Sequence, residues 1–166
     1  MTPDAHGDDL AFEAARTALR PDAPIEVDRL LLVVVGAHLR AEVADRPLAD
    51  RLVRQIRAWQ ARELDELDGP LLPLVCTDMW YLNEPALLER PAVVIGEPGV
   101  NAATAFYATR LPQALVIDDA WEIRMDPECI DPRVALWGEG PMQTERAADE
   151  FTRRVLDRYL RAVHCA

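Results

Sequence analysis

The chain has 166 residues, half of them hydrophobic and 28% charged, which is the balance of a folded globular domain rather than of a disordered protein. Its formal net charge of -11 disfavours phosphate backbones and anionic lipid surfaces, so we expect neither nucleic acid nor a membrane as partner. The sequence has no Lys and no Ser, which excludes lysine Schiff bases, a P-loop lysine and a serine nucleophile.

Cysteine usage and the amino-terminal segment bear on metal sites and on the compartment. Cys76, Cys129 and Cys165 are an odd number without CxxC spacing, so they predict neither a disulfide framework nor a zinc site. We therefore expect no metal and no cofactor. The acidic start lacks a basic segment followed by an apolar one, and the longest apolar run, Leu30 to Ala37, is far shorter than the roughly 18 residues of a spanning helix. These features predict a cytoplasmic protein.

The first part of the chain predicts a lead-in, a helix and a strand. We expect residues 1–7 to be disordered and residues 8–166 to form a single domain. Residues 8–19 have acidic side chains in their first turn and precede two prolines, a pattern that predicts a short helix. The β-branched run RLLLVVVGAH, residues 29–38, predicts a strand that is covered on both faces, as parallel strands are.

A long helix and a second strand follow. Apolar residues from Pro47 to about Leu67 trace one helical stripe, with Asp45 as the expected N-cap and Asp68-Gly69-Pro70 as the end. The segment LLPLVCTD, residues 71–78, predicts a strand. Pro73 favours an edge position or a late start for it, because proline cannot donate to a central ladder.

The second half of the chain alternates strands and helices. Residues 79–90 are expected to be a loop with one helical turn, and Asn101 is the expected N-cap of a helix that extends to Arg110. Around the turn signal Asp118-Asp119 two short strands are expected. The remaining expected elements are strands at PAVVIG and RVALWG and a closing helix from about Met142 to Val163, with Ala148, Phe151, Val155, Tyr159 and Val163 on one face.

Three segments share one plan, in which an apolar strand ends at a glycine and a helix follows. The glycines are Gly36, Gly96 and Gly138. This alternation predicts a three-layer α/β fold with a mostly parallel sheet, helices on both faces and one β-hairpin, residues 115–126, at an edge. The three glycines are then expected to lie along one edge of the sheet.

Ligands of open α/β sheets bind at the carboxyl ends of the strands, so the loops there supply the candidate residues. His38 beside Arg40 has the chemistry of a general acid or base, or of a phosphate-facing pair. Cys76-Thr77-Asp78 offers a thiol and a carboxylate, although a cysteine on an apolar strand is usually a small buried hydrophobe. The candidate catalytic residues are His38, Asp78 and Glu139, and the candidate ligand-binding residues are Arg40, Gly96, Glu97, Gly99, Asn101, Gly138 and Thr144.

Three further features each allow a structural interpretation beside the functional one. The loop Gly96 to Asn101 has the geometry of an anion site, yet it matches no phosphate-binding motif, and its glycines also suit a tight turn. Asp118-Asp119 offers two carboxylates to a cation, or forms the hairpin turn. Trp80 and Tyr81 form an aromatic cluster that predicts a subunit contact or the cover of a pocket.

The segments PAVVIGEPGVNAATAFYATRL and RVALWGEGPMQTERAADEFTRRVL resemble paired units of S-layer and cell-wall-binding repeat proteins. In those units an apolar strand ends in a glycine-containing turn before Asn or Thr and a helix. The resemblance covers about residues 91–160. It implies a non-catalytic structural or binding module in which Gly96, Gly99, Asn101, Gly138 and Thr144 define the fold. The acidic start does not resemble the secretion signal expected of that family, so we expect the resemblance to extend to the architecture and not to an envelope role.

Two functions fit the sequence. The first is a non-catalytic α/β binding or assembly module that self-associates or joins a protein partner, since no catalytic motif is present. The second is a small cytoplasmic enzyme, a hydrolase or glycosyl-transfer type, with an acidic site at the carboxyl edge of the sheet. The enzyme requires His38, Asp78, Asn101 and Glu139 to converge around a concave pocket.

Overall fold

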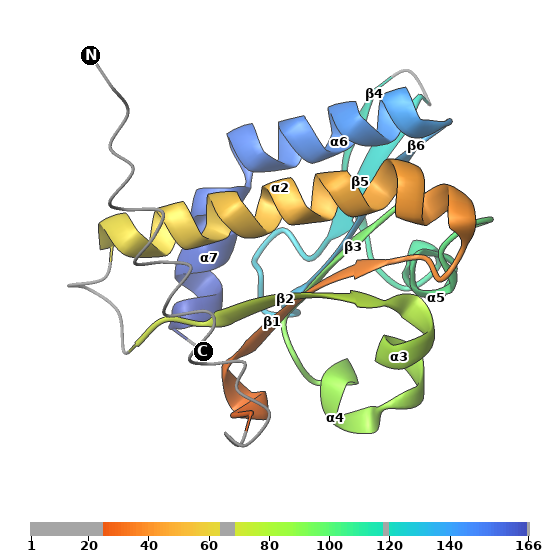
Figure 1. Ribbon diagram of the computed structural model, residues 1–166. Coiled ribbons are helices and arrows are strands. Elements are labelled where there is room, and N and C mark those ends of the chain that lie inside the picture. The colour runs from red at the N-terminus through yellow and green to blue at the C-terminus, as the bar shows by residue number, and fades with distance from the viewer. Residues whose placement is uncertain (1–24, 64–68, 118–119, 166) are drawn as a thin grey trace, which may run out of the picture.

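The computed structural model describes residues 25–63, 69–117 and 120–165 (Figure 1). The expected lead-in, the helix over residues 8–19, the end of the long helix at residues 64–68 and the Asp118-Asp119 turn lie outside the described residues. A short 3-10 helix, η1 (Val27–Arg29), precedes the first strand. In the described part of the chain, no helix is long and apolar enough to cross a membrane.

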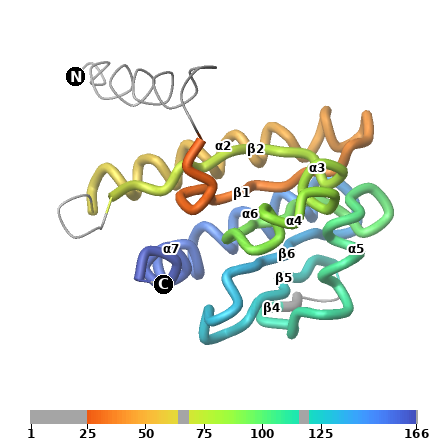
Figure 2. The backbone as a smooth tube through the Cα atoms, turned by 90° about the horizontal axis from the view of Figure 1, so that it is seen from below, coloured from red at the N-terminus to blue at the C-terminus, as the bar shows by residue number. Residues whose placement is uncertain are grey.

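Six strands in the described residues form one sheet in the order β2-β1-β3-β6-β5-β4. The strands are β1 (Leu30–Val35), β2 (Leu72–Thr77), β3 (Ala92–Ile95), β4 (Gln113–Ile117), β5 (Trp121–Met125) and β6 (Arg133–Gly138). β2, β1, β3 and β6 are parallel neighbours, whereas β5 is antiparallel to both β6 and β4. Figure 2 shows the β4–β5 hairpin at the end of the sheet opposite β2.

The sheet is therefore mixed, and the expectation of a mostly parallel sheet was wrong. The expected hairpin is present, but its second strand continues into β6 through residues 126–132. A connection of that length is shorter than the dozen or more residues of a parallel crossover, so β5 and β6 pair antiparallel. β2 is an edge strand, as Pro73 predicted.

Helices pack on the two faces of this sheet, and alternate residues of β1 divide between them. Leu31, Val33 and Val35 belong to the core under α2 (Leu39–Glu63), α6 (Pro141–Arg154) and α7 (Leu156–His164). The intervening residues of β1 belong to the core that also contains side chains of α3 (Asp78–Asn83), α4 (Pro85–Leu88) and α5 (Ala102–Ala108). The fully buried apolar strand was predicted correctly.

Helix α2 begins at Leu39, well before the expected start at Pro47. Asp45 is consequently not an N-cap but a buried residue inside the helix. Proline removes one N–H from the helical ladder, which normally disfavours an interior position. The turns of α2 before Pro47 nevertheless stay helical, because Ala41 is buried there with its β-carbon against Gly36. Packing thus outweighs the preference of Pro47 for the start of a helix.

Two other segments differ from expectation in detail. Residues 79–90 contain two short helices, because Thr77 caps α3 by accepting from the Trp80 amide and Pro85 begins α4. The closing helix is interrupted at Val155, whose φ of -122° is not helical, so α6 and α7 are separate. The predicted apolar face across both helices is nevertheless buried throughout.

The three strand-end glycines lie along one edge, as predicted. β1, β3 and β6 are adjacent and parallel, with Val35 opposite Ile95 and Ile95 opposite Leu136. Gly36, Gly96 and Gly138 follow at their carboxyl ends, and the Gly96 amide donates to the Leu136 carbonyl at 3.1 Å. This edge positions every candidate site residue.

Candidate functional site

Asp78 connects three loops at the carboxyl edge and is 4% exposed. Its carboxylate accepts hydrogen bonds from the backbone amides of Ala37 at 2.8 Å, Met79 at 2.7 Å and Ala102 at 2.6 Å. These amides belong to the loop after β1, to α3 and to the start of α5. Both oxygens of this buried carboxylate accept from backbone amides, so the contacts of Asp78 in the structure are those of a link between three segments.

Asn101 is fully buried and has a similar structural role. Its side-chain oxygen accepts from the amides of Ala103 at 2.9 Å and Thr104 at 3.2 Å, which confirms it as the N-cap of α5. Its side-chain nitrogen donates to the carbonyls of Ile95 at 2.8 Å and Val34 at 3.3 Å. Donors and acceptors are both used internally, and none is directed to a ligand.

The crevice between β1 and β3 is closed. This is the switch point of the sheet, since the chain leaves β1 toward β2 on one side while β3 lies on the other, and such crevices bind ligands in many α/β folds. Here a β-carbon at Gly36 would come within 2.1 Å of the Val100 carbonyl oxygen. The two loops are thus in direct contact, and a ligand site has to lie elsewhere on the edge.

His38 and Arg40 do not form an acid-base or phosphate-facing pair. His38 is exposed and its Nδ1 accepts from the backbone amide of Arg40 at 3.1 Å. The Arg40 guanidinium instead pairs with Glu97 Oε1 at 2.6 Å. The same Glu97 oxygen accepts from the amide of Gly140, the N-cap of α6. The amino terminus of α6 therefore holds the chain's own carboxylate.

Thr144 and Gly138 shape the loop after β6. The buried Thr144 hydroxyl accepts from the Gly138 amide at 3.1 Å and donates to the Gly140 carbonyl at 3.1 Å. A β-carbon at Gly138 would lie 2.4 Å from the β-carbon of Gln143, so the close approach of α6 requires glycine there. Thr144 stabilises the turn, and Gly138 contributes backbone to the cavity beside it.

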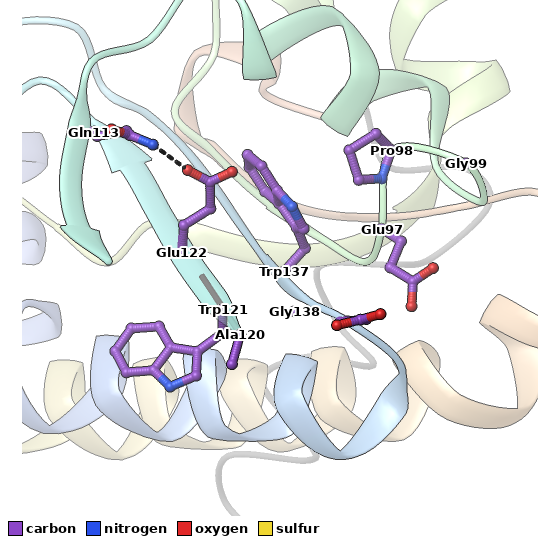
Figure 3. A pocket seen from close by; sticks show the side chains of 10 residues that line it. Glu97, Pro98, Gly99, Gln113, Ala120, Trp121, Glu122, Trp137 and Gly138 are labelled. Carbon is purple, nitrogen blue, oxygen red and sulfur yellow. Dashed lines mark hydrogen bonds between the residues drawn. The ribbon is translucent and has the colours of Figure 1, made fainter. Parts of the chain in front are cut away.

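A pocket of about 380 Å³ opens beside this loop (Figure 3). We call it the Glu-Trp pocket, and its lining residues are Glu97, Pro98, Gly99, Gln113, Ala120, Trp121, Glu122, Trp137, Gly138 and Glu139. Of the four residues that the enzyme hypothesis required to converge, Glu139 is the one that lines it. The other ligand-binding candidates that it gathers are Glu97, Gly99 and Gly138.

Two cross-strand neighbours form the wall of the Glu-Trp pocket. Glu122 of β5 lies opposite Trp137 of β6, and both are partly buried. Glu122 Oε2 accepts from the Gln113 amide group at 2.8 Å and from Arg124 Nε at 3.2 Å. The Arg124 guanidinium carbon lies 5.9 Å from the centre of the Trp137 ring. In Figure 3 the indole of Trp137 lies between Glu122 and Pro98.

Asp45 is a second acidic group at this edge that sequence reasoning assigned wrongly. Its carboxylate is buried against Gly96. Burial raises the pKa of Asp45 to about 6, an effect that the nearby Arg40 charge opposes and the Glu97 charge reinforces. Asp45 was predicted as an N-cap, and its position on the buried face of α2 was therefore missed. That position follows from its spacing of four residues from Ala41, which is also buried.

The Cys76-Thr77 segment carries no activated thiol. Cys76 is buried on β2, and burial raises the pKa of its thiol to about 12, so the thiol stays protonated at neutral pH. Thr77 is the N-cap of α3. The interpretation of Cys76 as a small buried hydrophobe is confirmed.

The Trp80-Tyr81 cluster does not act as one surface. Trp80 is 49% exposed, but Tyr81 is fully buried and its hydroxyl lies 2.7 Å from the Tyr107 hydroxyl. The expected interface role of Tyr81 was wrong, because adjacent residues of a helix point in different directions and Tyr81 faces the core. Trp80, with Met79 at 58% exposure, is the part of the cluster that a partner can reach.

Sequence reasoning missed the wall of the Glu-Trp pocket. The segment WEIRM alternates apolar and charged residues, which marks Glu122 and Arg124 as one polar face of a strand. Trp137 sits inside an apolar run that predicts a strand covered on both faces. The alternation was a usable signal for Glu122, whereas the exposure of Trp137 depends on which helices reach β6.

Among the described residues, no group of three or more His, Cys, Asp or Glu side chains is arranged to hold a metal ion. Comparisons of the sequence and the structure with protein-family models, curated proteins and solved structures found no match.

Proposed function

We propose that the chain is a non-catalytic binding module of three-layer α/β type, and that its ligand occupies the Glu-Trp pocket. The observation that carries the proposal is a cavity of about 380 Å³ with one aromatic wall and three carboxylates. A cavity of this size is within the range of roughly 300–1,000 Å³ of small-molecule sites. It also lies at the carboxyl edge, where ligands of α/β sheets bind.

Three of the candidate residues are engaged structurally, which supports binding over catalysis. The side chains of Asp78 and Asn101 form hydrogen bonds with backbone groups, and the thiol of Cys76 is buried and protonated. Arg40 is paired with Glu97. A non-catalytic structural or binding role is also what the resemblance of residues 91–160 to S-layer and cell-wall-binding repeats implies.

The test is a ligand screen against a variant in which the pocket is blocked. Gly99 lines the pocket, a β-carbon there meets nothing within 4 Å, and its φ is not positive, so Gly99→Leu adds bulk without strain. Ala61→Leu on the exposed side of α2 is the matched control. Amines, sugars, nucleotides and short peptides are screened by the thermal shift of the wild-type protein.

We expect compounds that raise the melting temperature of the wild-type and Ala61→Leu proteins to have no effect on Gly99→Leu. Hits that stabilise all three proteins equally, or a screen without any hit, would show that the pocket is not the binding site.

Association with a protein partner or with a second copy forms part of the proposal. Met79 and Trp80 expose large apolar side chains on α3. Size-exclusion chromatography with light scattering is expected to give a mass above that of the monomer, or a partner that co-purifies. Trp80→Glu is expected to abolish either result, and a strict monomer that never co-purifies with a partner contradicts association.

The convergence of His38, Asp78, Asn101 and Glu139 that an enzyme was expected to need is not seen at the pocket. A second candidate function, which would use a different set of carboxylates, is hydrolysis of a glycosidic bond. The observation that favours it is that Glu97, Glu122 and Glu139 line one pocket. Nitrophenyl glycosides separate the two functions: a binding module gives no turnover above background. Turnover that is lost in Glu139→Gln but kept in Glu128→Gln identifies a hydrolase.

A further inference from the structure

The lining of the Glu-Trp pocket is rich in hydrogen-bond acceptors. Among the described residues that line it, Glu97, Glu122 and Glu139 carry the charge and none is Arg, Lys or His, although Arg40 and Arg124 pair with Glu97 and Glu122 from outside the lining. The whole chain is also acidic, with a net charge of -11. A ligand that carries negative charge would be repelled from this cavity, and a ligand with several N–H donors would complement it.

The carboxylates of the pocket retain unused acceptor capacity. Glu97 accepts its two hydrogen bonds, from Arg40 and Gly140, through Oε1. Glu122 accepts its two, from Gln113 and Arg124, through Oε2. Within the residues that the structure describes, the exposed Glu139 side chain has no hydrogen bond or ion pair. Glu139 is therefore the negative charge of the pocket that no basic side chain of the described protein balances.

An arginine side chain of the protein already contacts this wall. Arg124 places its guanidinium 5.9 Å from the centre of the Trp137 ring while its Nε donates to Glu122. A planar guanidinium can lie over an aromatic ring and donate in its own plane to a carboxylate at the same time, which a compact ammonium cannot do equally well. Trp137 also lines the open cavity, together with Glu97 and Glu139.

We propose that the Glu-Trp pocket binds a guanidinium group, with Trp137 as the stacking surface and Glu139 as the principal counter-charge. This inference rests on the proposed binding function and specifies its ligand class. The guanidinium belongs either to a free small molecule or to an arginine side chain of a partner protein, because both present the same donors. The N–H groups of the guanidinium would donate hydrogen bonds to the free carboxylate oxygens of Glu97, Glu122 and Glu139.

The probes are argininamide and citrullinamide, which differ in charge because a urea replaces the guanidinium, while their shapes nearly match. Binding is measured from the NMR shift of the Trp137 indole N–H, assigned with Trp137→Phe. We expect argininamide to bind at least about tenfold more tightly than citrullinamide, as charge-assisted hydrogen bonds require. Equal affinities, or no binding of argininamide up to millimolar concentration, would overturn the inference.

The variants test the role of Glu139. Glu139→Gln is expected to weaken argininamide binding about threefold to tenfold, as loss of one exposed counter-charge does. Glu128→Gln makes the same charge change at the exposed turn between β5 and β6, at the opposite end of these strands, and is expected to leave affinity unchanged. Equal weakening by both variants would mean general attraction to an acidic surface and would contradict the pocket.

A capped Gly-Arg-Gly peptide separates the two sources. Tighter binding of the peptide than of argininamide supports an arginine side chain of a partner, and the reverse order supports a free guanidine compound. Failure of argininamide and the peptide, combined with other compounds whose thermal shift disappears in Gly99→Leu, rejects the guanidinium and leaves the binding function intact. Failure of every compound in that screen rejects the binding function itself.

Discussion

A carboxylate oxygen of Asp45 lies so close to Gly96 that a β-carbon at position 96 would come within 2.5 Å of it. Asp45 belongs to α2 and Gly96 to the end of β3, so this contact fixes the distance between the helix and the strand end from which the Glu97 loop starts. Gly96 also has a φ of +116°, which side chains of L-residues rarely adopt. The backbone conformation favours glycine here, and a β-carbon would in addition force the Asp45 carboxylate to move.

Gly96→Ala is expected to destabilise the protein by about 2–4 kcal/mol, because the methyl group adds a steric clash to an unfavourable φ. Gly99→Ala is the matched control three residues later, where the added β-carbon meets nothing within 4 Å. We expect its effect to stay within about 0.5 kcal/mol. Urea denaturation monitored by far-UV circular dichroism measures both. Similar stabilities of the two variants would mean that Asp45 and Gly96 are not in tight contact.

The raised pKa of Asp45 predicts a pH dependence of stability. Since the folded-state pKa, about 6, exceeds the ordinary value of 3.8, the folded protein binds the proton more tightly than the unfolded chain does. The stabilisation is complete below about pH 4 and is lost as the pH rises through 6. Asp45→Asn is expected to be more stable than the wild type at pH 7.5, by about 1–3 kcal/mol, and to lose this advantage at pH 4.

The pH series needs a control for the acidic character of the chain. Asp50→Asn makes the same change on the exposed side of α2. Denaturation midpoints of the two variants and the wild type are compared between pH 4 and pH 8. A constant difference between Asp45→Asn and the wild type over this range would show that Asp45 does not gain a proton in the folded state near pH 6.

The strands and their shared edge were predictable because their signals are local. The apolar run of β1 predicts a buried strand, and the glycine after β3 predicts a turn, each from only a few neighbouring residues. The start of α2 was not predictable in this way, since Pro47 and Asp45 look like a helix boundary. Ala41 and Asp45 are buried, and the burial of Asp45 depends on Gly96 after β3, which is distant in sequence.

The residues of the candidate site also divide into those that the local sequence predicts and those that depend on packing. Glu97, Gly99 and Glu139 were reachable from the sequence because they follow strand ends, and they do line the pocket. Position alone did not reveal that Asp78, at an equivalent strand end, turns toward backbone amides. Trp137 was missed because its accessibility depends on the arrangement of helices over β6 and not on its neighbours in sequence.

Asp78 is expected to contribute to stability and not to chemistry. Asp78→Ala removes the acceptor of three partly buried backbone amides, those of Ala37, Met79 and Ala102, and is expected to cost about 2–4 kcal/mol. Asp78→Asn keeps one of the two oxygens and should cost less. Chemical denaturation gives both values. A loss of stability below about 1 kcal/mol for Asp78→Ala would contradict its role as the link between the three loops.

The buried hydroxyl groups of Tyr81 and Tyr107, 2.7 Å apart, form a pair that a double-mutant cycle can measure. Burial, and to a smaller extent the hydrogen bond to Tyr107, raises the pKa of Tyr81, so the Tyr81 hydroxyl stays protonated. Tyr81→Phe strands the Tyr107 hydroxyl in the core and is expected to cost about 1–3 kcal/mol. Removing both hydroxyls should cost less than the sum of the single changes, with a coupling of about 1 kcal/mol in urea denaturation. If the stability losses of the two single variants simply add in the double variant, the two hydroxyls do not form a hydrogen bond. Because Tyr81 lies inside the core, Tyr81→Phe is expected to keep the oligomeric state of the wild type.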